Sequence, residues 1–228
     1  MKVMLCLLFL VSLVESLAQE DLQKKVFVFP VESDSAAVFL NVSIPQPLTS
    51  FTICLKYYSL LTREYSLFSY ATKEQFNQIL VIKPSQNQYR LWLGPVYVTF
   101  ILPEKKDSKP GWEHICVSWA SATGLVTLWL DGEPLPRMGL QKGYSISPEA
   151  SIVLGQDQDS FGGGFDASQS FVGEMKDLYM WDRVLNTDEV GLVLSDYVFS
   201  DYLINWRALN YEIKNYVILE PSLSYSTC

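Results

Sequence analysis

Apolar and polar residues alternate along most of this chain, and a period of two residues predicts β-strands. The alternation is clearest in residues 51–57, 89–93, 96–100 and 115–119, and a further strand-rich segment covers 171–181. From Leu125 to Leu130 nearly every residue is apolar, which predicts a strand buried on both faces. Asp131-Gly132 then predicts a turn. Because the strands are short and separated by Gly, Pro and Ser, we expect an all-β fold, a two-sheet antiparallel jelly-roll sandwich of the lectin type.

One segment predicts a short helix. Asn186 is placed to cap it, with Glu189 in the capping-box position three residues later. Val190, Val193 and Leu194 then form an apolar stripe at helical spacing. The sequence shows no internal repeat, low-complexity tract or linker. We therefore expect a single domain, since β-sandwiches of about 200 residues commonly share one core.

The N-terminus has the pattern of a secretory signal peptide. Lys2 precedes an apolar run from Val3 to Val14, and Ser16-Leu17-Ala18 supplies small residues before a cleavage site. The run is shorter than the roughly 20 apolar residues that span a bilayer, and no later segment is apolar enough. We expect a signal peptide at residues 1–18, a domain at residues 19–228, and a secreted, extracellular protein without a membrane span.

Charge and cysteine content narrow the function classes. The net charge is -8 and the chain has no Lys/Arg cluster, so nucleic-acid specificity is not expected, whereas acidity suits cation binding. Removal of the signal peptide takes Cys6 away. In an oxidising compartment Cys54 and Cys116 can pair, which leaves Cys228 for an intermolecular bond or a capped thiol. Asn41-Val42-Ser43 is an N-glycosylation sequon, whose occupancy the sequence leaves open.

The segment of residues 155–169 is the best candidate for chemistry, because it combines three carboxylates and several amides with glycines that allow sharp turns. Calcium prefers six to eight oxygen ligands of these kinds. The predicted ligands are the side chains of Asp157, Asp159, Asp166 and Gln169 and the backbone carbonyl of Gln158. The first two carboxylates and the carbonyl converge on one ion, while the last two side chains close over a second. A solvated glycine-rich turn stays open as the alternative, since the spacing is not that of an EF-hand.

Residues 114–121, which read His-Ile-Cys-Val-Ser-Trp-Ala-Ser, match the pentraxin signature H-x-C-x-[ST]-W-x-[ST], and the loop Gly-Gln-Asp-Gln-Asp-Ser-Phe-Gly-Gly resembles the acidic loop of that family. Further similarity is found at residues 26–30, 67–70, 180–182 and 205–209. The resemblance implies a jelly roll that assembles into a cyclic pentamer. It also implies two calcium ions on one face of each subunit, which coordinate anionic or phosphorylated ligands, and complement components as further partners.

The resemblance also implies roles for individual residues. Asp157, Asp159 and the Gln158 carbonyl match the shared calcium ligands, Asp166 and Gln169 match the second site, and Asn77 matches the first. Cys54 and Cys116 match the family's disulfide, and His114 matches a structural rather than a catalytic residue.

Several positions depart from the family pattern. Phe76 replaces a calcium-binding aspartate, and Asp157 replaces a longer bridging glutamate. Ile82 and Tyr97 stand at two ligand-pocket positions, where Ile82 keeps apolar contact and the ring of Tyr97 offers a cation–π face. The departures weaken the expectation of phosphocholine specificity and lower the expected calcium affinity.

Three function classes follow. The first is a secreted, calcium-dependent recognition protein of the humoral innate response, with multivalent binding of anionic or phosphorylated ligands. The alternative is an oligomeric interaction protein with weakened or lost calcium and ligand binding, which Phe76 favours. An enzyme is not expected, because the chain has a single histidine and neither an E-x-D-x-x-E strand motif nor a Gly-x-Ser-x-Gly motif.

Overall fold

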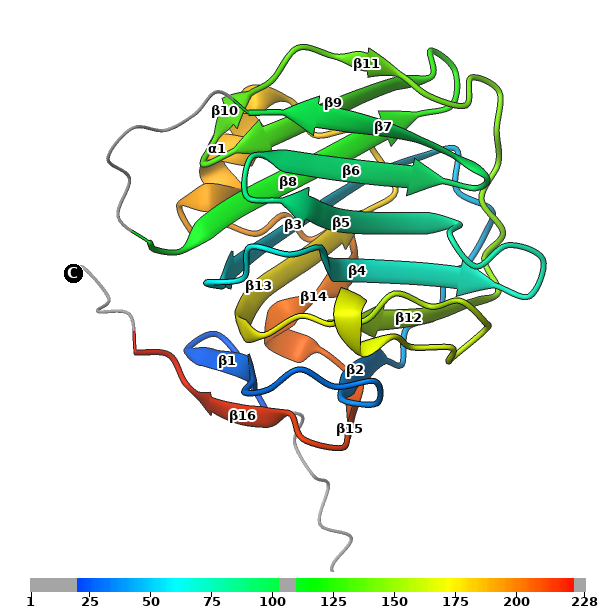
Figure 1. Ribbon diagram of the computed structural model, residues 1–228. Helices are drawn as coiled ribbons and strands as arrows, with labels where there is room; N and C mark the ends of the chain where they lie inside the picture. Colours follow the sequence, from blue (N-terminus) through cyan, green and yellow to red (C-terminus); the bar gives the residue numbers. More distant parts are fainter. Residues whose placement is uncertain (1–19, 103–109, 224–228) are drawn as a thin grey trace, which may run out of the picture.

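Two antiparallel β-sheets pack face to face in the computed structural model, which describes residues 20–102 and 110–223 (Figure 1). The first sheet has the strand order β10–β9–β8–β3–β13–β1–β16, with β11 paired to β9 and β14 to β13. Its strands are β10 (Glu133–Pro134), β9 (Leu125–Leu130), β8 (Glu113–Ala120), β3 (Ser50–Tyr58), β13 (Gly173–Trp181), β1 (Lys25–Phe29), β16 (Ile218–Pro221), β11 (Met138–Gly139) and β14 (Tyr202–Asn205).

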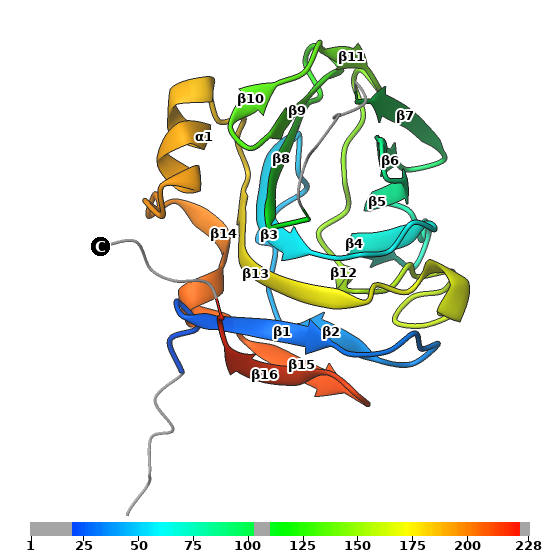
Figure 2. The same ribbon diagram turned by 60° about the vertical axis from the view of Figure 1, so that its left-hand side comes forward.

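The second sheet has the order β15–β2–β12–β4–β5–β6–β7. Its strands are β15 (Tyr211–Lys214), β2 (Ala37–Leu40), β12 (Ala150–Leu154), β4 (Tyr65–Thr72), β5 (Ile79–Ser85), β6 (Gln88–Leu93) and β7 (Val96–Ile101). The two layers are seen edge-on in Figure 2. The structure confirms the predicted all-β sandwich of two antiparallel sheets.

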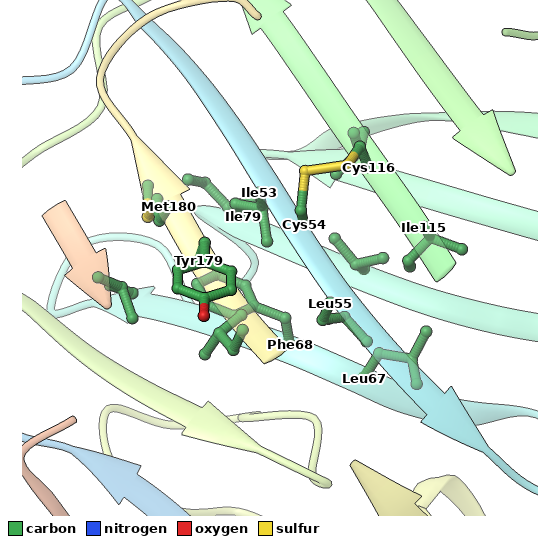
Figure 3. Packing of buried hydrophobic residues seen from close by; sticks show 14 of the residues in the cluster. Ile53, Cys54, Leu55, Leu67, Phe68, Ile79, Ile115, Cys116, Tyr179 and Met180 are labelled. Carbon is green, nitrogen blue, oxygen red and sulfur yellow. A yellow bond between two sulfur atoms is a disulfide. The ribbon is translucent and has the colours of Figure 1, made fainter. Parts of the chain in front are cut away.

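Alternate residues of each strand fill the space between the sheets. On β3, Phe51, Ile53 and Leu55 belong to the buried core, and the register with β8 places Ile115 directly opposite Leu55. Figure 3 shows Ile53, Leu55 and Ile115 from the first sheet near Phe68 from the second. The predicted period of two is confirmed here, because successive side chains of a strand point to opposite faces.

A single α-helix, α1 (Thr187–Leu194), was expected and is found among the described residues. The Asn186 side chain accepts from the Glu189 backbone N–H at 2.9 Å, and the Glu189 carboxylate accepts from the Asn186 N–H at 2.8 Å. This reciprocal pair is the predicted capping box. Val190 and Val193 are buried, and Thr187 accepts a hydrogen bond from Trp129 of β9 at 3.4 Å. The helix therefore covers part of the outer face of the first sheet, which explains why Trp129 of β9 is buried on that side.

The Cys54–Cys116 disulfide is present between β3 and β8 (Figure 3). The two residues are paired directly across the strands, and both are fully buried on the helix side of the first sheet. The predicted pairing is confirmed. Cys228, the expected signal peptide at residues 1–18 and the expected domain start at residue 19 lie outside the described residues.

Two short 3₁₀ helices were not predicted, at Ala167–Gln169 and Trp206–Ala208. Asp166 caps the first and Asn205 the second, each through a side-chain oxygen that accepts a backbone N–H two residues later. A segment of three residues is too short to show helical periodicity, so only the capping residues signal it. No helix within residues 20–102 and 110–223 is long and apolar enough to cross a membrane.

A buried ion pair joins the two sheets at one end of the sandwich. Lys83 of β5 is 4 % exposed, and its Nζ lies 2.9 Å from each carboxylate oxygen of Glu113 on β8. Tyr57 and Tyr89 also donate hydrogen bonds to Glu113. Burial acts to raise the pKa of Glu113, but the hydrogen bonds from Tyr89 and Lys83 outweigh it and lower that pKa below its usual value. The carboxylate therefore stays ionised beside its cation.

We expect Lys83→Met to lower the free energy of unfolding by about 3 kcal/mol, because it leaves the partly buried Glu113 carboxylate without its cation. The double variant Lys83→Met/Glu113→Leu should lose less than the single variant, since no unpaired charge remains. Urea denaturation of the two single variants and the double variant measures the coupling. Strictly additive losses would contradict the ion pair as a net contributor.

His114 is a second buried titratable group, on the outer face of the first sheet. The ring is 3 % exposed, its Nε2 lies 3.7 Å from Cys116 Sγ, and its Nδ1 makes no hydrogen bond to any described residue. Burial, together with the positive charge of Lys56, lowers the pKa of His114 to about 4. The imidazole is therefore neutral at neutral pH, which fits the predicted structural role.

Stability should fall as the pH drops from about 6.5 towards 4, because the unfolded chain then binds a proton at His114 that the folded chain does not. The lowered pKa of His114 should reduce the free energy of unfolding by about 2 kcal/mol at pH 5 relative to neutral pH. His114→Gln removes this contribution. Urea titrations at pH 7 and pH 5 should show a smaller acid-induced loss in the variant, and an equal loss would mean that His114 does not titrate as inferred.

Candidate calcium and ligand-binding face

The acidic loop of residues 155–169 lies on the outer face of the second sheet, on the side of the sandwich opposite α1 (Figure 2). Gln156 anchors the first part of this loop to its neighbours. The Gln156 side-chain amide donates to the backbone carbonyls of Ser33 at 2.8 Å and Ala36 at 2.9 Å, and the Gln156 carbonyl accepts from the Ser66 hydroxyl at 2.9 Å. The loop is thereby tied both to the chain before β2 and to β4.

Gln158 fastens the next part. Its side-chain amide donates to the carbonyls of Ser69 on β4 at 3.2 Å and Ser151 on β12 at 3.0 Å, and its side-chain oxygen accepts from the Gly162 N–H at 2.9 Å. The side chain is fully buried. It is therefore a structural anchor, and only the backbone carbonyl is left for the calcium role predicted for this residue.

Gly155 lets the loop leave β12 where no other residue fits. Its φ is +82°, and an added Cβ would lie 2.3 Å from the Phe29 ring. The Gly155 carbonyl accepts from the Phe171 N–H at 2.9 Å, which closes the loop at its base. The glycine is thus required by both backbone conformation and close packing.

Asp157 is held between the two glutamine anchors with its carboxylate turned into the protein. It is 5 % exposed, and its Oδ1 makes no hydrogen bond to any described residue. Burial, together with the negative charges of Asp159 and Glu64, raises the pKa of Asp157 to about 7. Because an unpaired buried carboxylate is costly, this geometry favours a bound cation.

Asn77 supplies a second oxygen of the same kind. It lies in the turn between β4 and β5, and its Oδ1 is buried with no hydrogen bond to the described chain. The turn and the acidic loop meet where Lys73 Nζ lies 6.0 Å from the Phe161 ring centre. The adjacent Phe76 is 41 % exposed and contributes no oxygen. This turn therefore offers only the amide of Asn77, whereas the family pattern has a carboxylate beside that amide.

The remaining predicted ligands lie along the rest of the loop. Asp159 and Asp166 are exposed, and the backbone N–H of Ser168 lowers the pKa of Asp166 by donating to its Oδ1 at 2.8 Å. Gln169 is half-buried in the 3₁₀ helix. Arg63 fixes this segment against the start of β4 by donating to the carbonyls of residues 168 and 170.

These donors are all oxygens, which is the set that calcium prefers. The buried, unpartnered oxygens of Asp157 and Asn77 fit a resident cation. Asp159 is close enough for its charge to act on Asp157. The metal role of every predicted ligand, shared between two ions, remains a prediction.

The outer face of β5, β6 and β7 continues from the loop. Ile82 is 4 % exposed and so offers almost no accessible surface, whereas Tyr97 is 49 % exposed. Arg90 lies with its guanidinium carbon 4.5 Å from the Tyr97 ring centre, and Trp92 contacts Tyr97 at a ring separation of 4.4 Å. Sequence reasoning proposed Ile82 and Tyr97 for ligand contact and did not single out Arg90 and Trp92, which both contact Tyr97 on this face. The alternation in residues 89–93 could have indicated Arg90 and Trp92, because it places their side chains on the face of the strand that points away from the core.

Asn41, the predicted glycosylation site, directly follows β2 and is exposed. Its side-chain amide donates to the Asn210 side chain at 3.4 Å. Asn41 also borders a shallow hollow that Tyr202 and Leu209 help to line. The position is accessible for modification, and glycosylation there remains a prediction.

Comparison with known proteins supports one family. The sequence profile of the Pentaxin family matches residues 25–221. C-reactive protein of Homo sapiens is 46 % identical over 195 residues, which cover 85 % of this chain and 86 % of that protein. Serum amyloid P-component of Bos taurus is 48 % identical over 184 residues, 81 % of each chain. A heptameric serum amyloid P-like pentraxin from Limulus polyphemus shares the fold, with a TM-score of 0.79 at 24 % identity over 89 % of this chain and 97 % of that one. The chain therefore belongs to the Pentaxin family, a family of binding proteins rather than enzymes.

Proposed function

We propose that this protein is a secreted, calcium-dependent recognition protein of the innate immune type. It binds anionic or phosphorylated ligands on the outer face of the second sheet. The observation that carries the proposal is the Asp157 carboxylate, buried beside Asp159 with an oxygen that no described residue satisfies. The C-reactive protein relatives and the disulfide support secretion and this class of function.

In this proposal the loop is fixed before any ligand arrives. Gln156 and Gln158 hold the backbone of residue 157 in place, and Asp157, Asp159 and the Gln158 carbonyl bind the first ion together with Asn77. Asp166 and Gln169 complete a second site. Bound calcium would supply the positive charge that attracts an anionic ligand group, while the anchored loop would hold the calcium in place.

Multivalency follows from assembly. Pentraxin homologues form cyclic oligomers, and the Limulus relative is heptameric. For this chain we propose the cyclic pentamer, with the binding faces arranged on one side. Such a ring gains avidity without strong single-site affinity, provided that several sites reach one surface. Complement components are the further partners proposed from the resemblance.

The competing function is an oligomeric interaction protein with weakened or lost calcium binding. Phe76 favours it, because a phenyl ring next to Asn77 provides neither charge nor oxygen to the first site. The buried Asp157 argues against it, since a chain without a cation there keeps an unfavourable buried carboxylate.

Asp157→Asn should abolish calcium binding while leaving the fold intact, because the amide keeps the shape and removes the charge. We expect the wild-type protein to bind calcium at about 10⁻⁴–10⁻³ M, the range of extracellular modules. Calorimetric titration measures the affinity, and calcium should raise the melting temperature of the wild type but not that of Asp157→Asn. Glu133→Gln, on the exposed β10 of the other sheet, is the matched control. Unchanged titration of Asp157→Asn would exclude this site.

Phe76→Asp should tighten calcium binding by about tenfold or more, because affinity depends on the number of charged ligands. The same variant should strengthen calcium-dependent capture on a phosphoethanolamine matrix. An unaltered titration curve would mean that the turn does not reach the metal, and the role of Asn77 would then fail as well. Phe161→Asp, an exposed aromatic position in the acidic loop, controls for added charge alone.

A further inference from the structure

The outer face of the second sheet carries two rows of side chains that run away from the acidic loop. The register pairs Ser66 with Ile82, Ile82 with Arg90, and Arg90 with Thr99. Directly paired residues of antiparallel strands point to the same side of a sheet. Since Ser66 binds the Gln156 carbonyl, Arg90 lies on the same face as the loop, two strands away.

The parallel row runs along Ser69, Leu80, Trp92 and Tyr97 by the same register. Ser69 binds the Gln158 side chain. Asp157 therefore lies above β4 between the two rows, while Arg90 and Trp92 lie on β6. Neighbouring strands are about 4.8 Å apart, which puts Arg90 about 10 Å from the calcium-binding part of the face.

Arg90 is held in one place on this face. Its Nε donates to Thr99 Oγ1 at 3.2 Å, and its guanidinium stacks on the Tyr97 ring, which in turn packs against Trp92. Nη1 and Nη2 make no hydrogen bond to a described residue. A positioned guanidinium with unused N–H groups is well suited to a carboxylate, phosphate or sulfate.

Glu64 shows where an acidic partner of Arg90 is accommodated. Its Oε2 lies 4.0 Å from Arg90 Nη1, which is an ion-pair distance but too long for a hydrogen bond. Both side chains are partly exposed, so this contact contributes little and can be replaced. A ligand oxygen at hydrogen-bonding distance would displace it.

We propose that Arg90 is a second anion-binding residue of this face and that it selects ligands with two acidic groups about 10 Å apart. One group binds at the calcium site and the other binds Arg90. The apolar surfaces of Trp92 and Tyr97 contact the part of the ligand near Arg90. A ligand whose second group is cationic would instead meet the guanidinium and be disfavoured. This inference rests on the proposed calcium-dependent function and specifies the ligand of the same site.

The test compares fructose 1,6-bisphosphate with fructose 6-phosphate, which differ by one phosphate. Each competes with the full-length oligomer for a phosphoethanolamine matrix at a fixed free calcium concentration. For the wild-type protein, we expect the bisphosphate to compete about tenfold more strongly than the monophosphate. This is the affinity that one additional charge-assisted hydrogen bond contributes. Arg90→Gln should remove that preference without altering competition by the monophosphate. Arg90→Lys should restore it in part.

Glu64→Gln gives the opposite result in the same assay. It removes the acidic side chain that competes for Arg90, so the preference for the bisphosphate should increase. Because Glu64 also acts electrostatically on Asp157, calcium titration of each variant sets the free calcium concentration at which the metal sites of all variants are equally occupied. If the wild type binds calcium and both sugars compete equally, or if Arg90→Gln keeps the preference, the inference is wrong and the proposed function stands. If chelator leaves capture on the matrix unchanged, the proposed function itself fails.

Discussion

The candidate site depends on two glutamine side chains that fasten the acidic loop to the second sheet. Gln156 and Gln158 together donate to backbone carbonyls before β2, on β4 and on β12, so the loop cannot move without breaking several buried hydrogen bonds. Leaving those donors unpaired would cost about 1–3 kcal/mol each. These anchors therefore fix the place at which Asp157 is buried. The loop is positioned by amides, and its carboxylates remain available for binding.

The two outer faces of the sandwich have different covers, and the proposed binding face is the one covered by a loop. On the first sheet, the Cys54–Cys116 disulfide, His114 and α1 make a covered surface with little access to solvent. On the second sheet, the cover is a loop rather than a helix, and exposed groups such as Tyr97 and Asp159 remain beside it. A helix buries an apolar stripe continuously, whereas a glycine-rich loop presents oxygens. The sequence of each covering segment therefore determines whether its face is closed by apolar packing or presents oxygen atoms for binding.

Local patterns were enough to predict the strands, the capping box of α1 and the acidic loop, because each depends on residues close in sequence. The role of Gln158 was predicted only for its carbonyl, and its buried side-chain anchors to Ser69 and Ser151 were missed. Arg90 was missed for the same reason. The position of Arg90 is set by its contacts with Thr99, Tyr97 and Glu64. Those contacts follow from strand register and loop placement. A period of two shows which side of a strand faces out, but not what lies on the neighbouring strand.

The charge on the proposed binding face must also be balanced, because its carboxylates lie close together. Asp157, Asp159 and Glu64 place negative charge near one another, and this repulsion adds to burial in raising the pKa of Asp157. An anionic ligand would be repelled by this group unless cations are present. In the proposed function, calcium would supply positive charge at the loop, and Arg90 would supply it two strands away. With Phe76 in place of a carboxylate, the proposed metal site has one negative charge fewer, so a larger share of ligand attraction would fall on Arg90 than in a face where calcium is bound more tightly.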